Sequence, residues 1–168
     1  MSASFEHGRL LLIQRRYELA ERALRQAVSE DPDAPLGHAL LALALDGLDR
    51  HGEGLIEAEE AVRLAPDEPL CHYVRAGSLQ SLDRSQEAEA AIREAIRLDP
   101  SDADYHARLA SILYVQSRWS EALEASEAGL RQDPQNVDCI NFRGMALTKL
   151  GRREEARDAV TGALALDP

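Results

Sequence analysis

Aromatic residues are scarce in this 168-residue chain, at 4% of the sequence, although hydrophobic residues make up 45%. Alanine and leucine supply most of the apolar content, which favours helices that meet closely at small side chains over β-sheets. Basic residues are also few: 19 Lys and Arg against 30 Asp and Glu give a net charge of −11. This balance argues against binding to nucleic acid or to anionic membranes, since both need clustered basic residues.

Long hydrophobic runs are missing as well. No apolar stretch approaches the roughly 18 residues that cross a bilayer. The four-residue run 10–13 has no basic region ahead of it, so no signal peptide is predicted and we expect a cytoplasmic protein. Lysine is nearly absent, because Lys149 is the one lysine among 19 basic residues. This arginine bias favours a GC-rich, bacterial genome.

Prolines recur at a fixed interval. Consecutive members of the set Pro32, Pro66, Pro100, Pro134 and Pro168 are 34 residues apart. A period of this size indicates a stack of similar supersecondary units. Four further columns share the period: small residues at Gly8, Ala42, Ala76, Ala110 and Gly144 and at Ala20, Gly54, Ala88, Ala122 and Ala156, leucines at Leu11, Leu45, Leu79, Leu113 and Leu147, and arginines at Arg16, Arg50, Arg84, Arg118 and Arg152. Small residues allow helix backbones to approach closely, and leucine fills the space beside them.

Apolar spacing within each unit is helical, with a short polar turn between two stretches. In the third unit the turn is Asp83-Arg84-Ser85, and each Asp-Pro or Ala-Pro ends a second helix because proline disfavours α conformation in the residue before it. The spacing predicts ten helices, as five antiparallel pairs of roughly thirteen residues per helix. Each column arginine is expected near the C-terminus of a first helix, where a cation is favoured and can bond free carbonyls. Exposed ion pairs with nearby glutamates are also expected.

These columns resemble the tetratricopeptide repeat family over the whole chain. The resemblance implies an all-α, right-handed solenoid: one array over residues 1–168, with repeats at approximately 1–34, 35–68, 69–102, 103–136 and 137–168. The chain departs from the family pattern where His38, His72 and His106 occupy a position that often holds a large residue, and where Ala58 and Ser126 replace a large apolar one. We expect looser local packing there, without loss of the fold.

The resemblance also implies a function. In this family the first helices line a concave groove that binds proteins or peptides, and the matching positions here include Phe5, Arg9, Leu12, Leu36, Leu43, Tyr73, Gln80, Tyr114 and Asn141. The N-terminal half of this set is apolar and the C-terminal half is polar and mildly acidic. We therefore expect a helix or extended segment with apolar anchors, followed by a basic tail. Alternatively, leucines such as Leu36 and Leu43 pack only against neighbouring helices. Capture of a peptide C-terminal carboxylate is not expected, because the groove lacks the required Lys and Asn pattern.

Other chemistry finds little support in the sequence. Equivalent residues in adjacent repeats lie about 10 Å apart, too far for His38, His72 and His106 to share one metal ion. The two cysteines, Cys71 and Cys139, are two repeats apart. They are therefore expected to be small buried hydrophobes and not a disulfide. No catalytic motif is present, so we expect neither an enzyme nor a cofactor or metal site.

The last repeat suggests a second possibility. No polar capping helix follows Asp167-Pro168, so Val160 and Leu164 would be exposed where another repeat would stack. Three explanations stay open: a longer array, self-association through these residues, or a tolerated apolar surface. Self-assembly is therefore the alternative to partner binding.

Overall fold

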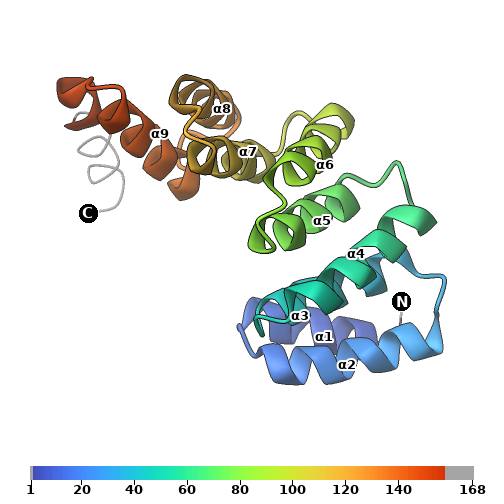
Figure 1. The fold of residues 1–168 in the computed structure, drawn as a ribbon. Helices are drawn as coiled ribbons and strands as arrows, with labels where there is room; N and C mark the ends of the chain where they lie inside the picture. The colour runs from blue at the N-terminus through green and yellow to red at the C-terminus, as the bar shows by residue number, and fades with distance from the viewer. Residues whose placement is uncertain (1, 158–168) are drawn as a thin grey trace. The chain divides into compact units, whose positions relative to one another are not determined.

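The computed structural model describes residues 2–157, and every regular element within them is an α-helix (Figure 1). The helices are α1 (Ala3–Ile13), α2 (Tyr17–Glu30), α3 (Pro35–Asp46), α4 (His51–Leu64), α5 (Pro69–Ser81), α6 (Ser85–Leu98), α7 (Ala103–Val115), α8 (Trp119–Gln132) and α9 (Val137–Lys149). Residues 153–157 are helical too. The prediction of an all-α chain with paired helices of about thirteen residues is confirmed.

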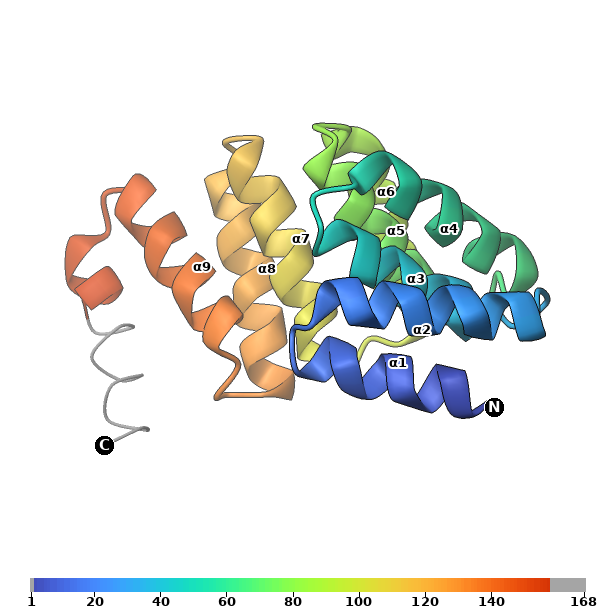
Figure 2. The same ribbon diagram turned by 90° about the horizontal axis from the view of Figure 1, so that it is seen from below.

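The chain divides into two units, residues 1–98 (unit 1) and 99–168 (unit 2), which we describe separately. In unit 1, α1 packs on α2, α3 on α4 and α5 on α6; in unit 2, α7 packs on α8. Figures 1 and 2 show these pairs as antiparallel neighbours. First helices of successive pairs also touch within a unit, α1 with α3, α3 with α5, and α7 with α9. Side chains on the first helices therefore form neighbouring rows.

The columns of small residues lie where helices approach each other. Ala20, Ala42 and Ala88 are 0% exposed, and a Cβ added at Gly8 would stand 2.6 Å from Cγ of Leu24. The leucine column fills the adjacent space, since Leu45 is also 0% exposed. Close packing of this kind explains why a 34-residue period of small and large residues specifies the fold.

The turn inside each pair has a repeated backbone conformation. A residue with positive φ stands at Arg15 (56°), Asp49 (58°), Asp83 (59°), Ser117 (61°) and Gly151 (78°), again at intervals of 34 residues. The next residue is the column arginine, and its backbone N–H donates to the carbonyl five residues earlier, as from Arg50 to Leu45 at 3.0 Å. This pair of features is the Schellman cap, which satisfies the last carbonyls of the first helix.

The column arginines stand at the C-terminus of the first helix, as predicted. There the backbone N–H of each one bonds a free carbonyl of that helix. The side chains instead reach the glutamate three residues on, in the first turn of the second helix: Arg50 with Glu53 at 2.6 Å and Arg84 with Glu87 at 2.7 Å. Arg118 pairs with Glu121 in the same way, and Arg152 with Glu155. The predicted exposed ion pairs with nearby glutamates are thus confirmed for these four arginines.

Candidate functional site

The predicted groove residues lie in rows on the first helices. In unit 1 they come in pairs seven residues apart, Phe5 with Leu12 on α1, Leu36 with Leu43 on α3, and Tyr73 with Gln80 on α5. Two helical turns separate the members of each pair, so they share a helix face. All of them except Phe5 are half-buried, whereas Arg9 is exposed.

Apolar members of these rows also support the core. Leu12 packs against a buried cluster that includes Leu24 and Leu45. Leu43 and Tyr73 pack against a second cluster around Val74. Part of each side chain therefore packs against neighbouring helices, as the alternative interpretation predicts. The remaining part is exposed and is the surface that a partner could contact.

Phe5 and Leu36 line a cavity of about 370 Å³ in unit 1, the smaller of the two cavities described for the chain. It lies where the start of α1, the end of α2 and the start of α3 meet, and Asp31 and Asp33 are part of its lining. Phe5 is only 7% exposed. It is therefore mainly a packing residue, with little surface left for a ligand.

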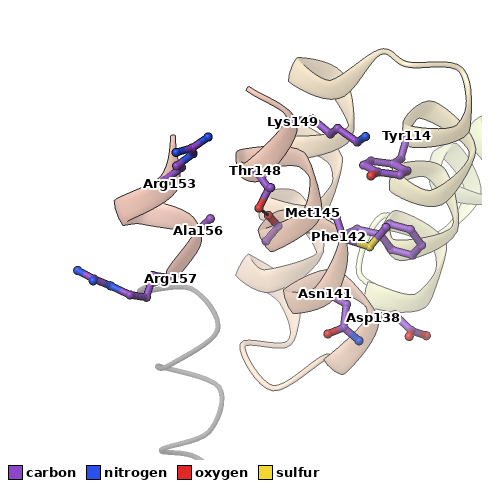
Figure 3. A pocket seen from close by; sticks show the side chains of 11 residues that line it. Tyr114, Asp138, Asn141, Phe142, Met145, Thr148, Lys149, Arg153, Ala156 and Arg157 are labelled. Atoms are coloured by element: carbon purple, nitrogen blue, oxygen red, sulfur yellow. Dashed lines mark hydrogen bonds between the residues drawn. The ribbon is translucent and has the colours of Figure 1, made fainter. Parts of the chain in front are cut away.

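A larger pocket of about 740 Å³ lies in unit 2 (Figure 3). Its lining comes from Tyr114 on α7, from one face of α9, and from the helical residues 153–157: Tyr114, Asp138, Asn141, Phe142, Gly144, Met145, Thr148, Lys149, Arg153, Ala156 and Arg157. The rings of Tyr114 and Phe142 pack at a tilt, with centroids 6.3 Å apart. Met145 is 41% exposed beside them. The pocket thus joins two predicted groove residues, Tyr114 and Asn141, to Lys149 and Arg153, which are not among the predicted groove positions.

The charges around this pocket differ from the sequence-based expectation. Lys149, Arg153 and Arg157 line it, against Asp138 as the acidic residue of the lining. Figure 3 shows Lys149 on the side of Tyr114, and Arg153 and Arg157 on the helical segment facing α9. The expected polar and mildly acidic residues, such as Asp138 and Asn141, do line the pocket, but three basic residues line it as well. The one lysine of the chain was the signal that could have indicated it.

The histidine column has a structural role. Nε2 of His38, His72 and His106 lies 2.9, 2.7 and 3.1 Å from the carbonyl oxygen of Pro32, Pro66 and Pro100, respectively. Because a carbonyl only accepts, Nε2 carries a hydrogen in each ring. The prediction of hydrogen-bonded histidines is confirmed. The shared partner, however, is the turn that precedes the helix, and only His38 also reaches a neighbouring helix, at Glu57 with 2.7 Å.

A serine, a histidine and an aspartate meet in unit 1, but not in a nucleophilic arrangement. Ser78 Oγ donates to Asp46 at 2.6 Å, and His51 Nδ1 lies 3.2 Å from the same carboxylate. The serine therefore bonds to the carboxylate and not to the imidazole that would have to activate it. Ser78 is also 0% exposed, so the group joins α3 to α5 and α4.

The two cysteines are buried thiols. Cys71 and Cys139 are both 0% exposed and free. Burial raises the pKa of Cys71 to about 11 and that of Cys139 to about 12. The prediction of small buried hydrophobes is confirmed. Over residues 2–157 no group of three His, Cys, Asp or Glu side chains could hold a metal ion, and no helix could span a membrane. Val160 and Leu164, the predicted self-association residues, lie outside the described residues.

Sequence models of known families match nearly the whole chain. A model described as tetratricopeptide repeat matches residues 5–69 and 73–137, and a second model with the same description matches residues 137–168. No curated protein sequence matches the chain.

Solved structures show the same fold. A thermophilic TPR protein of Thermus thermophilus, TTC0263, superposes with a TM-score of 0.88 at 19% identity, over 98% of this chain and 90% of that one. MamA superposes with a TM-score of 0.79 at 21% identity, over 98% of this chain and 94% of that one. YrrB is described as a TPR protein with an unusual peptide-binding site. It superposes with a TM-score of 0.71 at 20% identity, over 98% of this chain and 85% of that one. At these identities the likeness concerns the fold.

Proposed function

Because this chain belongs to the tetratricopeptide repeat family, we propose that it is a non-catalytic scaffold that binds a peptide or helix of a partner protein along its first helices. The observation that carries the proposal is the set of half-buried rows on α1, α3 and α5 in unit 1 and the pocket of α7 and α9 in unit 2. YrrB, which shares the fold, is described as having a peptide-binding site.

A preformed surface suits this role. Within each unit the first helices pack on second helices and on one another, α1 with α3, α3 with α5 and α7 with α9, so the surface is ordered before a ligand arrives. A flexible segment then bears most of the ordering cost of binding. Partly exposed leucine and tyrosine side chains on such a surface serve as anchors for apolar residues of the segment.

The test begins with selection of peptides from a random library displayed against the full chain. Leu43→Ala, Tyr73→Ala and Tyr114→Ala should each weaken a selected peptide about fivefold to thirtyfold, the loss expected when one anchor contributes about 1–2 kcal/mol. Controls are Ile56→Ala and Leu19→Ala, which change apolar residues that are 66% and 38% exposed on the second helices α4 and α2. Urea unfolding of every variant separates lost binding from lost stability. Equal weakening by groove and control variants would refute binding along the first helices.

Self-assembly through the last repeat is the rival. Its residues, Val160 and Leu164, make it testable by light scattering over a range of concentrations. A concentration-dependent mass that returns to 18.5 kDa in Val160→Glu/Leu164→Glu would favour the rival. A constant 18.5 kDa would exclude it. A bacterial, cytoplasmic setting is proposed from the arginine bias and composition, and cell fractionation with an antibody tests it.

A further inference from the structure

The pocket of unit 2 combines an apolar floor with a basic edge, in a protein whose net charge is −11. From this combination we propose, resting on the scaffold function above, that the pocket binds an acidic linear segment of a partner protein. An aromatic or aliphatic side chain of that segment sits against Tyr114, Phe142 and Met145. Its Asp or Glu carboxylates face Lys149 and Arg153.

The floor fits one apolar anchor. Tyr114 and Phe142 hold each other at a ring distance of 6.3 Å, which fixes two walls. Met145 is 41% exposed, and its flexible thioether adapts to side chains of different shape. Thr148 donates its hydroxyl to the carbonyl of Gly144 at 2.8 Å, so its polar group is satisfied within α9 and its methyl group is left to the pocket. An apolar side chain therefore finds contacts here without displacing an internal hydrogen bond.

The edge carries two basic groups, Lys149 and Arg153, whose charges are not paired within residues 2–157. Several arginines elsewhere in the chain pair with glutamates on their own helices, as in Arg63 with Glu60 and Arg97 with Glu94. Among residues 2–157, by contrast, neither Lys149 nor Arg153 has an ion-pair partner, and Asp138 is the acidic group in the lining. Carboxylates of a ligand can supply the missing partners, whereas a basic segment would meet repulsion.

The smaller cavity provides an internal contrast. Its charged residues are Asp31 and Asp33, so its edge is acidic where the edge of the larger pocket is basic. An acidic segment is therefore favoured at one of the two cavities and disfavoured at the other. The overall negative charge of the chain makes the basic edge stand out further, because an acidic ligand is repelled by most of the remaining surface.

The experiment uses the full chain and a short fluorescent peptide with a central Phe flanked by Asp and Glu, acetylated and amidated so that its ends carry no charge. Fluorescence anisotropy measures its affinity at several salt concentrations. Two comparison peptides replace the acidic residues with Lys, or the Phe with Ser. We expect binding of the acidic Phe peptide, roughly tenfold or more weaker binding of either comparison peptide, and severalfold loss of affinity between low and high salt.

Two protein variants locate the site. Lys149→Glu/Arg153→Glu should weaken the acidic peptide about tenfold or more, because two attractions become repulsions. The matched control is Arg22→Glu/Arg131→Glu, which makes the same change of net charge at exposed residues of α2 and α8 and should leave the affinity within about twofold. Circular dichroism shows whether each variant keeps its helices. Lys149 is the single lysine, so carbodiimide coupling of peptide carboxylates should give an adduct that mass spectrometry maps to Lys149.

The outcomes separate this proposal from the scaffold function. Equal binding of the Lys peptide, or equal weakening by the control pair, overturns the acidic-segment proposal. If library peptides without acidic bias bind and depend on Leu43 or Tyr73, the scaffold function stands and this proposal is wrong. If no peptide binds at all, both are wrong for linear segments. An adduct at the N-terminal amine alone, without one at Lys149, also counts against the pocket.

Discussion

Unit 1 uses several charged groups to join its own helices, whereas two basic residues at the pocket of unit 2, Lys149 and Arg153, have no such partner among residues 2–157. In unit 1, Glu21 of α2 accepts from Arg50 at 2.7 Å, and His38 of α3 bonds Glu57 of α4. In unit 2, Lys149 and Arg153 have no ion pair among residues 2–157, and Met145 is 41% exposed. Repeats of one pattern have thus come to differ in what their polar residues do. Substitutions should accordingly cost stability in unit 1 and binding in unit 2.

The largest difference is expected for apolar residues. Leu45→Ala removes a side chain that is 0% exposed in unit 1 and should lower the free energy of unfolding by about 2–5 kcal/mol. Met145→Ala in unit 2 should cost less than about 1 kcal/mol, since Met145 is 41% exposed. Urea unfolding followed by circular dichroism measures both. Similar losses from the two substitutions would remove the contrast.

A smaller loss is expected when the His38 pair is broken. In repeat three, Ala91 stands where repeat two has Glu57, and Nδ1 of His72 is buried without a partner. Glu57→Ala should give His38 the same unsatisfied Nδ1 and lower the free energy of unfolding by about 1–3 kcal/mol. Glu59→Ala, at an exposed position of α4, is the control. If Glu57→Ala and the control unfold at the same urea concentration, the bond between His38 and Glu57 adds nothing to the stability of the fold.

Acid should reveal the link between α2 and α4. Burial would raise the pKa of Glu21, but its bonds to Arg25 and Arg50 outweigh burial and hold the pKa below the ordinary 4.5. A lowered folded-state pKa contributes stability above the unfolded value, and this contribution is lost as the pH falls through the folded value. Compared with Glu21→Gln, the native chain should be more stable at neutral pH, by less than about 1 kcal/mol. The two should converge below pH 4.5, and a constant difference in thermal unfolding would contradict the link.

The smallest stability effect is expected at the basic edge of the larger pocket. Lys149→Glu/Arg153→Glu should change the free energy of unfolding by less than about 0.5 kcal/mol, because neither side chain supports another element. The same variant is the one expected to lose the acidic peptide. A large loss of stability, measured in urea, would mean that these residues hold the repeat together and are not reserved for a ligand.

Much of the fold could be predicted from the 34-residue period. The columns of proline, leucine and small residues mark helix ends and contact positions, so pairing and helix length follow from local rules. The caps were less visible, because four of the five positive-φ residues are Arg15, Asp49, Asp83 and Ser117, and only Gly151 is a glycine. The column arginines do follow the ends of the first helices as predicted, and it is their backbone N–H groups that make the cap bonds.

The candidate site was predicted in part. The rows of Leu12, Leu43 and Tyr73 are where the repeat pattern indicated, because residues seven apart on a helix share a face. Phe5 is predicted as a ligand contact but is only 7% exposed, in a region shared with the end of α2 and the loop that follows it. How far a side chain is covered depends on those neighbours, which a repeat alignment does not describe.

The helices, their pairing and the family follow from the order of amino acids alone, because each of these depends on contacts within one repeat or between adjacent ones. Which side chains share a pocket depends on how the helices are arranged in three dimensions. Tyr114 and Arg153 are separated by more than one repeat, and they line one cavity because α7, α9 and residues 153–157 surround it. Charge at a site is the sum over residues brought together in space, so a chain that is acidic as a whole can still present a basic pocket.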